Sequence, residues 1–393
     1  MHAAPKAAYV HIPFCVKKCG YCDFVSYAGQ PAEVQKSYVQ AIRQEISLAA
    51  VLRAQPLETV FFGGGTPTVL DAGLLTFILG EIGDRFGIAP DAEITLEANP
   101  GTVSAAGLTA CRQAGFNRIS FGLQVIKAEL LRVLGRIHDQ QDFTAGVEMA
   151  VKVGFQSINA DILFGVPGQT VDDVVEITNF LTKMPVDHIS FYSLNLEEGT
   201  PLKAWCDENP DHLPDEDIER QQYWTIKTEL EKSGFEHYEI SNAARPGCRC
   251  RHNLVYWHAL PYFGFGAAAH SYILGRRRAN TPDLTRYIDI FTRVARLGDG
   301  SAGGLAGAFP AAAVLETVDE PAARKEMLFL GLRLLEGVRF DDFLKRFGVD
   351  MRVLFAGNIK RLVARGLLIE DSQGIRASRL GLDLANQIFM EFV

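Results

Sequence analysis

Residues 9–24 read YVHIPFCVKKCGYCDF, and this stretch decides how the rest of the chain is interpreted. An apolar run is followed by Cys15, Cys19 and Cys22, with the spacing C-x3-C-x2-C. Soft thiolates on one loop favour an iron–sulfur cluster or a zinc ion. A structural zinc ion needs four ligands, so the zinc alternative also requires His11 or a distant residue. The spacing therefore predicts a metal-binding loop after the first strand, with the cluster favoured.

Short apolar stretches alternate with amphipathic stretches over the first 240 residues. The predicted strands are Tyr9–Phe14, Thr59–Phe62, Glu93–Leu96, Arg118–Leu123, Ser157–Leu163 and His188–Leu194. The predicted helices are Val34–Leu52, Leu74–Phe86, Ala105–Ala114, Phe143–Val153, Val171–Leu181 and Glu216–Lys232. Strand–helix units at roughly 30-residue intervals favour parallel strands joined by right-handed crossovers. We therefore predict an α/β fold, a partial (β/α)6 barrel, with a doubly wound sheet as the alternative.

Polar and glycine-rich segments follow the predicted strands. Gly63–Pro67 follows the second strand, Glu97 the third, Gln124 the fourth, and Asp161 with Gly165–Gln169 closes the fifth. In both candidate folds, ligands bind at the carboxyl ends of the strands. These segments are therefore expected to line a ligand site.

The pattern changes after Gly275, so residues 1–275 are predicted to form the barrel. Residues 276–320 are expected to be a linker or an extension, because 298–313 are rich in Gly and Ala. Residues 321–393 are expected to form a winged-helix-like domain. It has predicted helices at Arg324–Leu335, Asp341–Arg346, Met351–Arg365 and Leu380–Phe392, and a hairpin at Leu368–Ser378. DNA binding by this tail is disfavoured, because its 12 Lys and Arg nearly balance its 9 Asp and Glu.

The composition limits the classes of protein to which the chain can belong. The 393 residues are 48% hydrophobic and 22% charged, which supports a sizeable core and argues against global disorder. The formal charge of −8 disfavours nucleic acid as a partner. Residues 1–8 lack an apolar signal core, and we expect a cytoplasmic protein, with peripheral contact with a membrane left open. Seven cysteines, an odd number, favour metal binding over a disulfide framework.

The cysteine loop, with Tyr9, His11 and Tyr21, resembles the radical S-adenosylmethionine (SAM) superfamily. It is most similar to the branch that contains oxygen-independent coproporphyrinogen III oxidase and the HemW-type heme chaperones. The resemblance implies a [4Fe–4S] cluster on Cys15, Cys19 and Cys22, with SAM on the open iron and reductive cleavage to a 5′-deoxyadenosyl radical. By the same resemblance, SAM or its cavity would be lined by Tyr9, Tyr21, Gly64, Gly65, Thr66, Glu97, Gln124, Arg136, Asp161 and His270.

Two features distinguish members of this branch. Phe24 occupies the position of a further cysteine in the oxidase pattern. Residues 252–257, HNLVYW, resemble the HNxxYW motif of the chaperones. Imidazole is a common heme ligand, so His252 is the candidate ligand of a heme iron, flanked by Tyr256 and Trp257. The adjacent Cys248 and Cys250 are alternative heme ligands.

The resemblance therefore implies a heme chaperone that uses a [4Fe–4S] cluster and SAM and delivers heme to heme-dependent enzymes. Its partners would be heme, client proteins that receive it, and an electron donor. The alternative is a coproporphyrinogen III oxidase that decarboxylates propionates by radical chemistry, and Phe24 argues against it. RNA modification is a third hypothesis, which the acidic composition disfavours. Whether the protein is an enzyme, and its oligomeric state, stay open.

Overall fold

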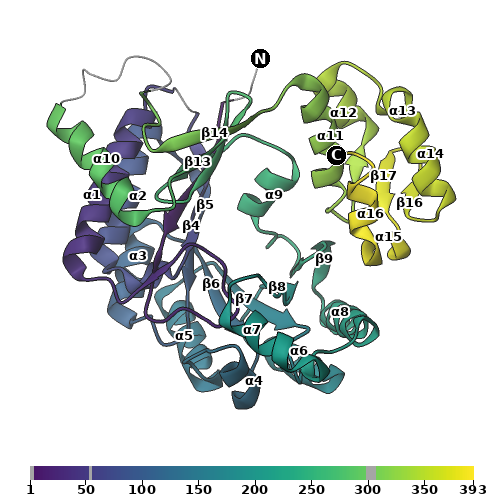
Figure 1. The fold of residues 1–393 in the computed structure, drawn as a ribbon, viewed down its shortest axis with the longest axis horizontal. Coiled ribbons are helices and arrows are strands. Elements are labelled where there is room, and N and C mark those ends of the chain that lie inside the picture. Colours follow the sequence, from purple (N-terminus) through teal and green to yellow (C-terminus); the bar gives the residue numbers. More distant parts are fainter. Residues whose placement is uncertain (1–3, 53–54, 298–306) are drawn as a thin grey trace.

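A large, mostly parallel sheet organises the first domain (Figure 1). The computed structural model describes residues 4–52, 55–297 and 307–393. Within these ranges the sheet has nine strands in the order β11-β1-β4-β5-β6-β7-β8-β10-β9. The strands are β1 (Ala7–Ile12), β4 (Leu57–Gly64), β5 (Ile88–Ala98), β6 (Arg118–Gln124), β7 (Ser157–Phe164), β8 (His188–Ser193), β9 (Glu236–Glu239), β10 (Asn242–Ala244) and β11 (Phe263–Phe265).

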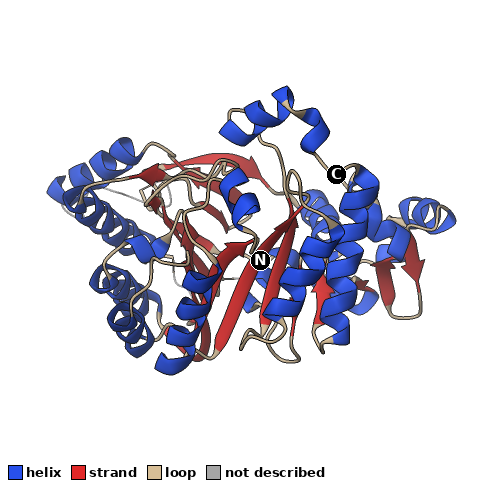
Figure 2. Ribbon diagram, turned by 90° about the horizontal axis from the view of Figure 1, so that it is seen from below, coloured by secondary structure: helices blue, strands red, loops and turns tan. Residues whose placement is uncertain are grey.

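The strand order confirms the partial barrel. From β1 to β8 the parallel strands follow one another in chain order, whereas a doubly wound sheet starts in its middle and reverses direction. β11 pairs parallel with β1 at one edge, and β10 pairs antiparallel with β8 near the other. Helices cover the outer face of the curved sheet (Figure 2). They are α1 (Ala32–Ala49), α2 (Ala72–Phe86), α3 (Ala105–Ala114), α5 (Gln140–Val153), α6 (Val171–Leu181) and α8 (Glu216–Lys232). The short α4 (Ala128–Val133) follows β6 and belongs to a separate apolar cluster.

Local capping fixes where these helices begin. The predicted and observed ranges agree for α3, α6 and α8. α5 begins three residues before the predicted Phe143, because the Asp139 carboxylate accepts hydrogen bonds from the backbone of Gln141 and Asp142. Apolar periodicity alone therefore missed the polar first turn of this helix.

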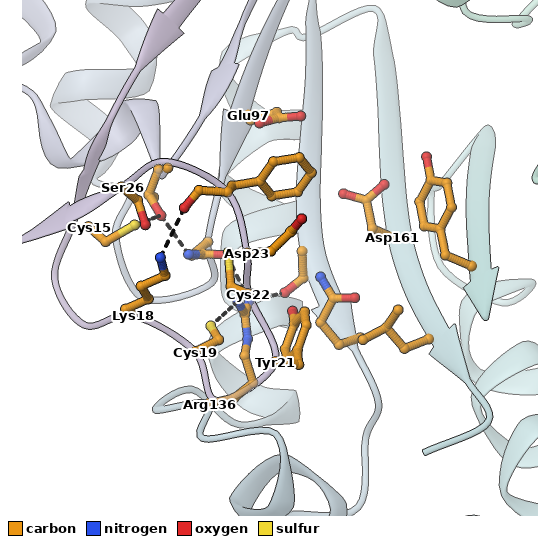
Figure 3. Close-up of a pocket in the computed structure, with 18 of the residues that line it drawn as sticks. Cys15, Lys18, Cys19, Tyr21, Cys22, Asp23, Ser26, Glu97, Arg136 and Asp161 are labelled. Atoms are coloured by element: carbon orange, nitrogen blue, oxygen red, sulfur yellow. Dashed lines mark hydrogen bonds between the residues drawn. The ribbon is translucent and has the colours of Figure 1, made fainter. Parts of the chain in front are cut away.

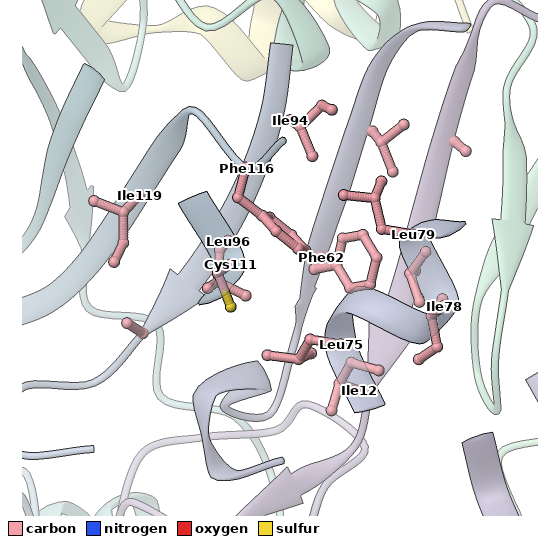
Figure 4. Packing of buried hydrophobic residues seen from close by; sticks show 14 of the residues in the cluster. Ile12, Phe62, Leu75, Ile78, Leu79, Ile94, Leu96, Cys111, Phe116 and Ile119 are labelled. Atoms are coloured by element: carbon pink, nitrogen blue, oxygen red, sulfur yellow. The ribbon is translucent and has the colours of Figure 1, made fainter. Parts of the chain in front are cut away.

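The main core lies between the sheet and its helices (Figure 4). Phe62 of β4 and Phe116 meet edge to face, with ring centroids 5.0 Å apart. Leu75 and Ile78 of α2 pack against them, and the buried Cys111 of α3 belongs to the same cluster. These side chains hold β4 and β5, whose carboxyl ends bear Gly64 and Glu97, in a fixed position.

The segment 276–320 packs on the barrel. Its strands β13 (Arg276–Asn280) and β14 (Ala312–Thr317) extend β12 (His270–Ile273) into a small sheet. Between them, α10 (Leu284–Leu297) packs against α1 through buried residues that include Tyr287 and Phe291. The segment is therefore an integrated extension of the barrel over its described residues. Residues 298–306 of the expected Gly- and Ala-rich loop lie outside the described residues.

The C-terminal domain has its own apolar core and a small β wing, as expected for a winged-helix-like module. The predicted helix Met351–Arg365 is broken at the buried Phe355, and the predicted helix Leu380–Phe392 is broken at Leu384. The elements are α11 (Glu320–Gly331), β15 (Val338–Arg339), α12 (Phe340–Phe347), α13 (Met351–Leu354), α14 (Ala356–Ala364), β16 (Leu368–Glu370), β17 (Gly374–Ala377), α15 (Arg379–Asp383) and α16 (Ala385–Phe389). In the described ranges, every helix is too short or too polar to cross a bilayer.

The C-terminal domain is attached to the barrel by polar contacts. The carboxylate of Asp383 accepts hydrogen bonds from Arg220, at 2.7 Å, and from the indole nitrogen of Trp224, at 2.6 Å. The Arg379 guanidinium lies over the Trp224 ring, 4.5 Å from its centroid. These contacts tie α15 to α8, so the domain has a defined position on the barrel.

One buried carboxylate joins α1 to the extension. Glu45 accepts hydrogen bonds from the backbone of Gly266 at 2.8 Å, from Asn280 at 2.6 Å and from Tyr287 at 2.5 Å. The side chain is completely buried. Burial raises its pKa to about 7, although the three hydrogen bonds lower the pKa in part. Because each donor comes from a different segment, Glu45 holds α1, the end of β11, β13 and α10 together.

This carboxylate makes stability depend on pH. Between pH 4.5 and about 7 the folded protein keeps a proton that the unfolded chain has released, so stability falls as pH rises through this window. We expect a loss of about 3 kcal/mol from Glu45 over the window. The difference between the pH profiles of wild type and Glu45→Gln, from urea unfolding, isolates this contribution. Parallel profiles would contradict it.

Candidate active site

A cavity of about 400 Å³ lies at the carboxyl ends of the barrel strands. It is large enough for a small-molecule cofactor. The cysteine loop forms one wall, and the ends of β5, β6, β7 and β8 form the other (Figure 3). The predicted residues that line it are Cys15, Cys19, Cys22, Tyr21, Gly64, Gly65, Thr66, Glu97, Gln124, Arg136 and Asp161.

Cys15 ends β2 (Phe14–Cys15), and Cys19 and Cys22 lie in the loop between this strand and β3 (Tyr27–Ala28). The two short strands pair in parallel. All three are free and half-buried. Burial raises the thiol pKa of Cys15, opposed by a hydrogen bond from Thr66, and burial also raises that of Cys22. A bound metal would overcome this shift, because metal binding stabilises the thiolate.

The donor set of the loop fits a cluster. Cys15, Cys19 and Cys22 all line the main cavity, so three soft thiols face one space. A structural zinc ion would need a fourth ligand. His11, the extra ligand of the zinc alternative, is buried and hydrogen-bonded to Tyr9 and to the backbone of Val25. These residues therefore fit a [4Fe–4S] cluster.

A chain of hydrogen bonds joins two of the thiols. Arg136 donates to Cys19 Sγ at 3.3 Å and to the Asn99 amide oxygen at 2.7 Å. Asn99 donates to Thr66 Oγ1 at 2.7 Å, and Thr66 donates to Cys15 Sγ at 3.8 Å. Hydrogen bonds to cysteine sulfur stabilise the thiolate form. The sequence interpretation missed Asn99, although it stands two residues after Glu97 at the same strand end.

The glycine run at the end of β4 is required by close contacts. A Cβ on Gly64 would lie 2.6 Å from the His11 ring, and the φ of Gly64 is 116°. A Cβ on Gly65 would lie 2.7 Å from the carbonyl oxygen of Phe14 and 3.0 Å from Cys15 Sγ. The run therefore lets the end of β4 pass directly beside the cysteine loop.

Two carboxyl groups face the cavity, Glu97 from β5 and Asp161 from β7, the two strands that flank β6 (Figure 3). Glu97 accepts a hydrogen bond from the backbone of Gly64, and burial, with the nearby Asp161, raises its pKa to about 8. Asp161 accepts hydrogen bonds from Ser120 and Asn159, and burial raises its pKa as well. Glu97 is therefore largely protonated at neutral pH and can donate a hydrogen bond to a ligand.

Three other predicted cavity residues differ in position. Gln124 lines the cavity with a φ of 68°, at a bulge where β6 pairs with β7. Such backbone strain in a residue other than glycine is frequent at functional sites. Tyr9 faces a second, inner cavity, and His270 is exposed at the start of β12, outside the lining of the main cavity.

The inner cavity, of about 200 Å³, lies inside the barrel and shares Glu97, Ser120, Asp161 and Tyr192 with the main cavity. α9 (Arg251–Trp257), which contains the HNLVYW segment, borders it. The remaining lining residues are Tyr9, Phe61, Arg118, Asn159, Ser190, Cys250, His252, Asn253 and Tyr256. The segment predicted for heme therefore lies next to the predicted SAM site.

His252 is 1% exposed, and both ring nitrogens are in hydrogen bonds. Nδ1 lies 2.8 Å from Thr59 Oγ1, and Nε2 lies 2.9 Å from the hydroxyl of Tyr256. Burial, and secondarily the charge of Arg118, lowers the pKa of His252 to about 3, so the imidazole is neutral. A neutral imidazole is the form that binds metals, but in this conformation its nitrogens are occupied.

Trp257 and the two cysteines that precede α9 differ in exposure. The half-buried Trp257 lies under Arg333, whose guanidinium is 4.4 Å from the ring centroid, and α9 packs against α11. Cys250 is buried and donates to Glu93, and burial raises its pKa to about 12. Cys248 is half-buried. Trp257 therefore contacts the C-terminal domain, and Cys250 is a protonated thiol.

The barrel and the thiol loop at its strand ends define a radical SAM protein. The family model "Radical SAM superfamily" matches residues 9–181, and "HemN C-terminal domain" matches residues 318–384. The solved structure of coproporphyrinogen III oxidase (HemN) from Escherichia coli has a TM-score of 0.83 and 23% identity. That alignment covers 99% of this chain and 90% of the oxidase. This likeness shows a shared fold.

The sequence relatives are more specific. Heme chaperone HemW of Bacillus subtilis (strain 168) is 36% identical over 390 residues, which cover 99% of each protein. HemW of Lactococcus lactis is 32% identical, covering 99% of this chain and 97% of the relative, and HemW of Escherichia coli K12 is 36% identical, covering 68% and 70%. The chain belongs to the HemW family. This result confirms the family and the fold expected from the sequence.

The close contact at Gly65 predicts a sensitive position for the cluster. In Gly65→Ala the new methyl group would push the loop at Phe14 and Cys15, at a cost of about 1–3 kcal/mol. We expect reduced iron content and weaker cluster absorbance after anaerobic reconstitution. Gly80→Ala in α2 is the control, because a Cβ there meets nothing within 4 Å. Equal iron content in the two variants would refute the role given to Gly65.

Proposed function

We propose that the protein is a heme chaperone, which binds heme and delivers it to heme-dependent enzymes such as respiratory proteins. The observation that carries the proposal is the end-to-end similarity to relatives named heme chaperone HemW. Phe24 supports it, because this side chain is 64% exposed at the cavity where the oxidase pattern has a thiol. An exposed aromatic ring offers an apolar face to a porphyrin. The client proteins and a cytoplasmic location remain part of the proposal.

The chain's own residues would hold the cofactors. Cys15, Cys19 and Cys22 would bind the [4Fe–4S] cluster, and when bound it would supply the electron for reductive cleavage of SAM. Polar groups around the cavity would orient SAM, with Glu97 and Arg136 on opposite sides of the cysteine loop. The residues proposed for SAM are Tyr21, Gly64, Gly65, Thr66, Glu97, Gln124, Arg136 and Asp161, with Tyr9 and His270 more distant.

We further propose His252 as the heme ligand, with Tyr256 as its gate. The Tyr256 hydroxyl occupies Nε2 at 2.9 Å, whereas Thr59 holds Nδ1 and so fixes the ring. A hydrogen bond to the other ring nitrogen orients an imidazole that binds a metal. Rotation of Tyr256 and displacement of α9 would therefore expose a preoriented, neutral nitrogen to the iron. Trp257 contacts Arg333 of the C-terminal domain, and through this contact it would connect a displacement of α9 to that domain.

A heme titration of three proteins tests the function and the ligand. Wild type should saturate near one heme per chain. His252→Ala should bind at least about tenfold more weakly, a loss of roughly 1.4 kcal/mol, with an altered Soret band. Tyr256→Phe should bind more tightly or faster, because the variant frees Nε2. No binding by wild type would overturn the chaperone proposal. Equal binding by all three proteins would mean that another residue binds the heme iron, and Cys248 would be the next residue to substitute.

The second candidate function is oxidation of coproporphyrinogen III, which the shared fold with the oxidase favours. It requires decarboxylation of propionates in the presence of SAM and a reductant. An anaerobic assay of the reconstituted protein with coproporphyrinogen III separates the two functions. Protoporphyrinogen formation would support the oxidase, and heme binding without it would support the chaperone.

A further inference from the structure

We propose that the inner cavity binds a carboxylate group, which Arg118 holds through its guanidinium. Arg118 is not among the residues proposed for SAM or for the heme iron. Two sources offer this chemistry, a propionate arm of heme and a small free carboxylic acid. The site itself rests on the geometry of the inner cavity, whereas its assignment to a heme propionate rests on the proposed function.

The alternation of side chains along β6 places Arg118 inside the barrel. Ile119, Phe121 and Leu123 belong to the core between the sheet and its helices. Because successive side chains of a strand point to opposite faces, Arg118 and Ser120 point the other way, and both line the inner cavity. Arg118 is the first residue of β6. It therefore enters the inner cavity from the end of the strand opposite the cysteine loop.

The guanidinium of Arg118 is buried with hydrogen-bonding capacity to spare. The residue is 3% exposed, and its Nε and Nη2 atoms have no hydrogen-bond partner among the described residues. Arginine keeps its positive charge in proteins, and a buried charge without hydrogen bonds is costly. The two N–H groups on one side of a guanidinium match the two oxygens of a carboxylate. Nε and Nη2 form such a pair, so they specify a carboxylate as the ligand.

Acidic residues lie near Arg118 outside the lining of the inner cavity, and they have donors of their own. Burial lowers the pKa of Arg118, but nearby acidic groups, among them Glu93 and Asp187, raise it above the usual value. Glu93 accepts hydrogen bonds from two backbone N–H groups at the start of α9, at 3.0 and 2.9 Å. Asp187 accepts a hydrogen bond from Ser157 at 2.7 Å. These acids favour the charged form of Arg118 and leave its Nε and Nη2 without an acceptor.

The lining of the inner cavity itself has little negative charge to repel an anion. Among the described residues of the lining, Arg118 is the one permanent cation, and the acids are Glu97 and Asp161. Glu97 is largely protonated at neutral pH, and burial also raises the pKa of Asp161. His252 in the same lining is neutral. A carboxylate beside Arg118 would therefore compensate a positive charge that the lining leaves largely unbalanced.

Size and position favour a heme propionate as the source of the carboxylate. A cavity of about 200 Å³ is smaller than the usual pocket for a whole cofactor, so it suits an acidic side arm rather than a porphyrin ring. Its lining also contains His252, the proposed ligand of the heme iron. The inner cavity shares wall residues with the main cavity, where Phe24 is exposed. A heme bound through His252 would therefore bring its propionates toward Arg118.

The experiment titrates the full chain with hemin and with hemin dimethyl ester, in which both propionates are esterified. Wild type should bind hemin about tenfold more tightly than the ester, because only hemin offers a carboxylate to Arg118. In Arg118→Met the two affinities should agree within about twofold, and Arg118→Lys, which keeps the charge without the planar fork, should show an intermediate preference. Arg278→Met is the matched control, because it removes a buried arginine of β13 outside the inner cavity, and it should keep the wild-type preference.

A second arm tests a free carboxylate by thermal unfolding in sodium acetate and in sodium chloride at equal ionic strength. A higher Tm in acetate for wild type and not for Arg118→Met, with equal binding of hemin and ester, would assign the site to a small free acid. If Arg118→Met does not fold, Arg118→Lys decides both arms. A wild type with neither a preference for hemin nor an acetate effect, or an Arg118→Met variant that retains them, would overturn the proposal. A wild type that binds no heme would refute the chaperone function, while the acetate arm would still test the site.

Discussion

The close approach of β4 to the cysteine loop is the constraint on which the rest of the site depends. The backbone at Gly64 and Gly65 leaves no space for a Cβ against His11, Phe14 and Cys15. Because β4 pairs with both β1 and β5, this contact also sets where Glu97 stands relative to the thiols. The core at Phe62 and Phe116 holds the same strands from behind. Cluster loop, cofactor cavity and sheet are thus parts of one packed unit.

The interior of the barrel is polar along its length, and this property connects the two cavities. Glu97, Ser120, Asp161 and Tyr192 border both. These shared side chains therefore lie between the strand ends near the thiols and α9. α9 in turn contacts the C-terminal domain at Trp257. A ligand in either cavity would therefore contact the same wall residues.

Much of the fold and part of the site followed from the sequence. Apolar periodicity was sufficient for α3, α6 and α8, and the rule for parallel strands placed Glu97, Gln124 and Asp161 around one cavity. Breaks such as Phe355 were missed, because a buried aromatic residue fits a helical pattern and only tertiary packing bends the chain there. The hydrogen bond between Tyr256 and His252 was missed for a related reason, since spacing gives proximity and not the partner. The hydrogen bonds of Asn99 join Thr66 and Arg136, which lie far apart in the chain, and a single sequence does not show such contacts.

The integration of β13, α10 and β14 into the barrel has a practical consequence for fragments of this protein. A fragment that ended at Gly275 would lack Asn280 and Tyr287, and it would leave the Glu45 carboxylate buried beside α1 without two of its three donors. A buried acid in that state destabilises its surroundings. A stable fragment that retains the cofactor cavity therefore needs at least β13 and α10, so limited proteolysis should not release a stable product cut between β12 and β13.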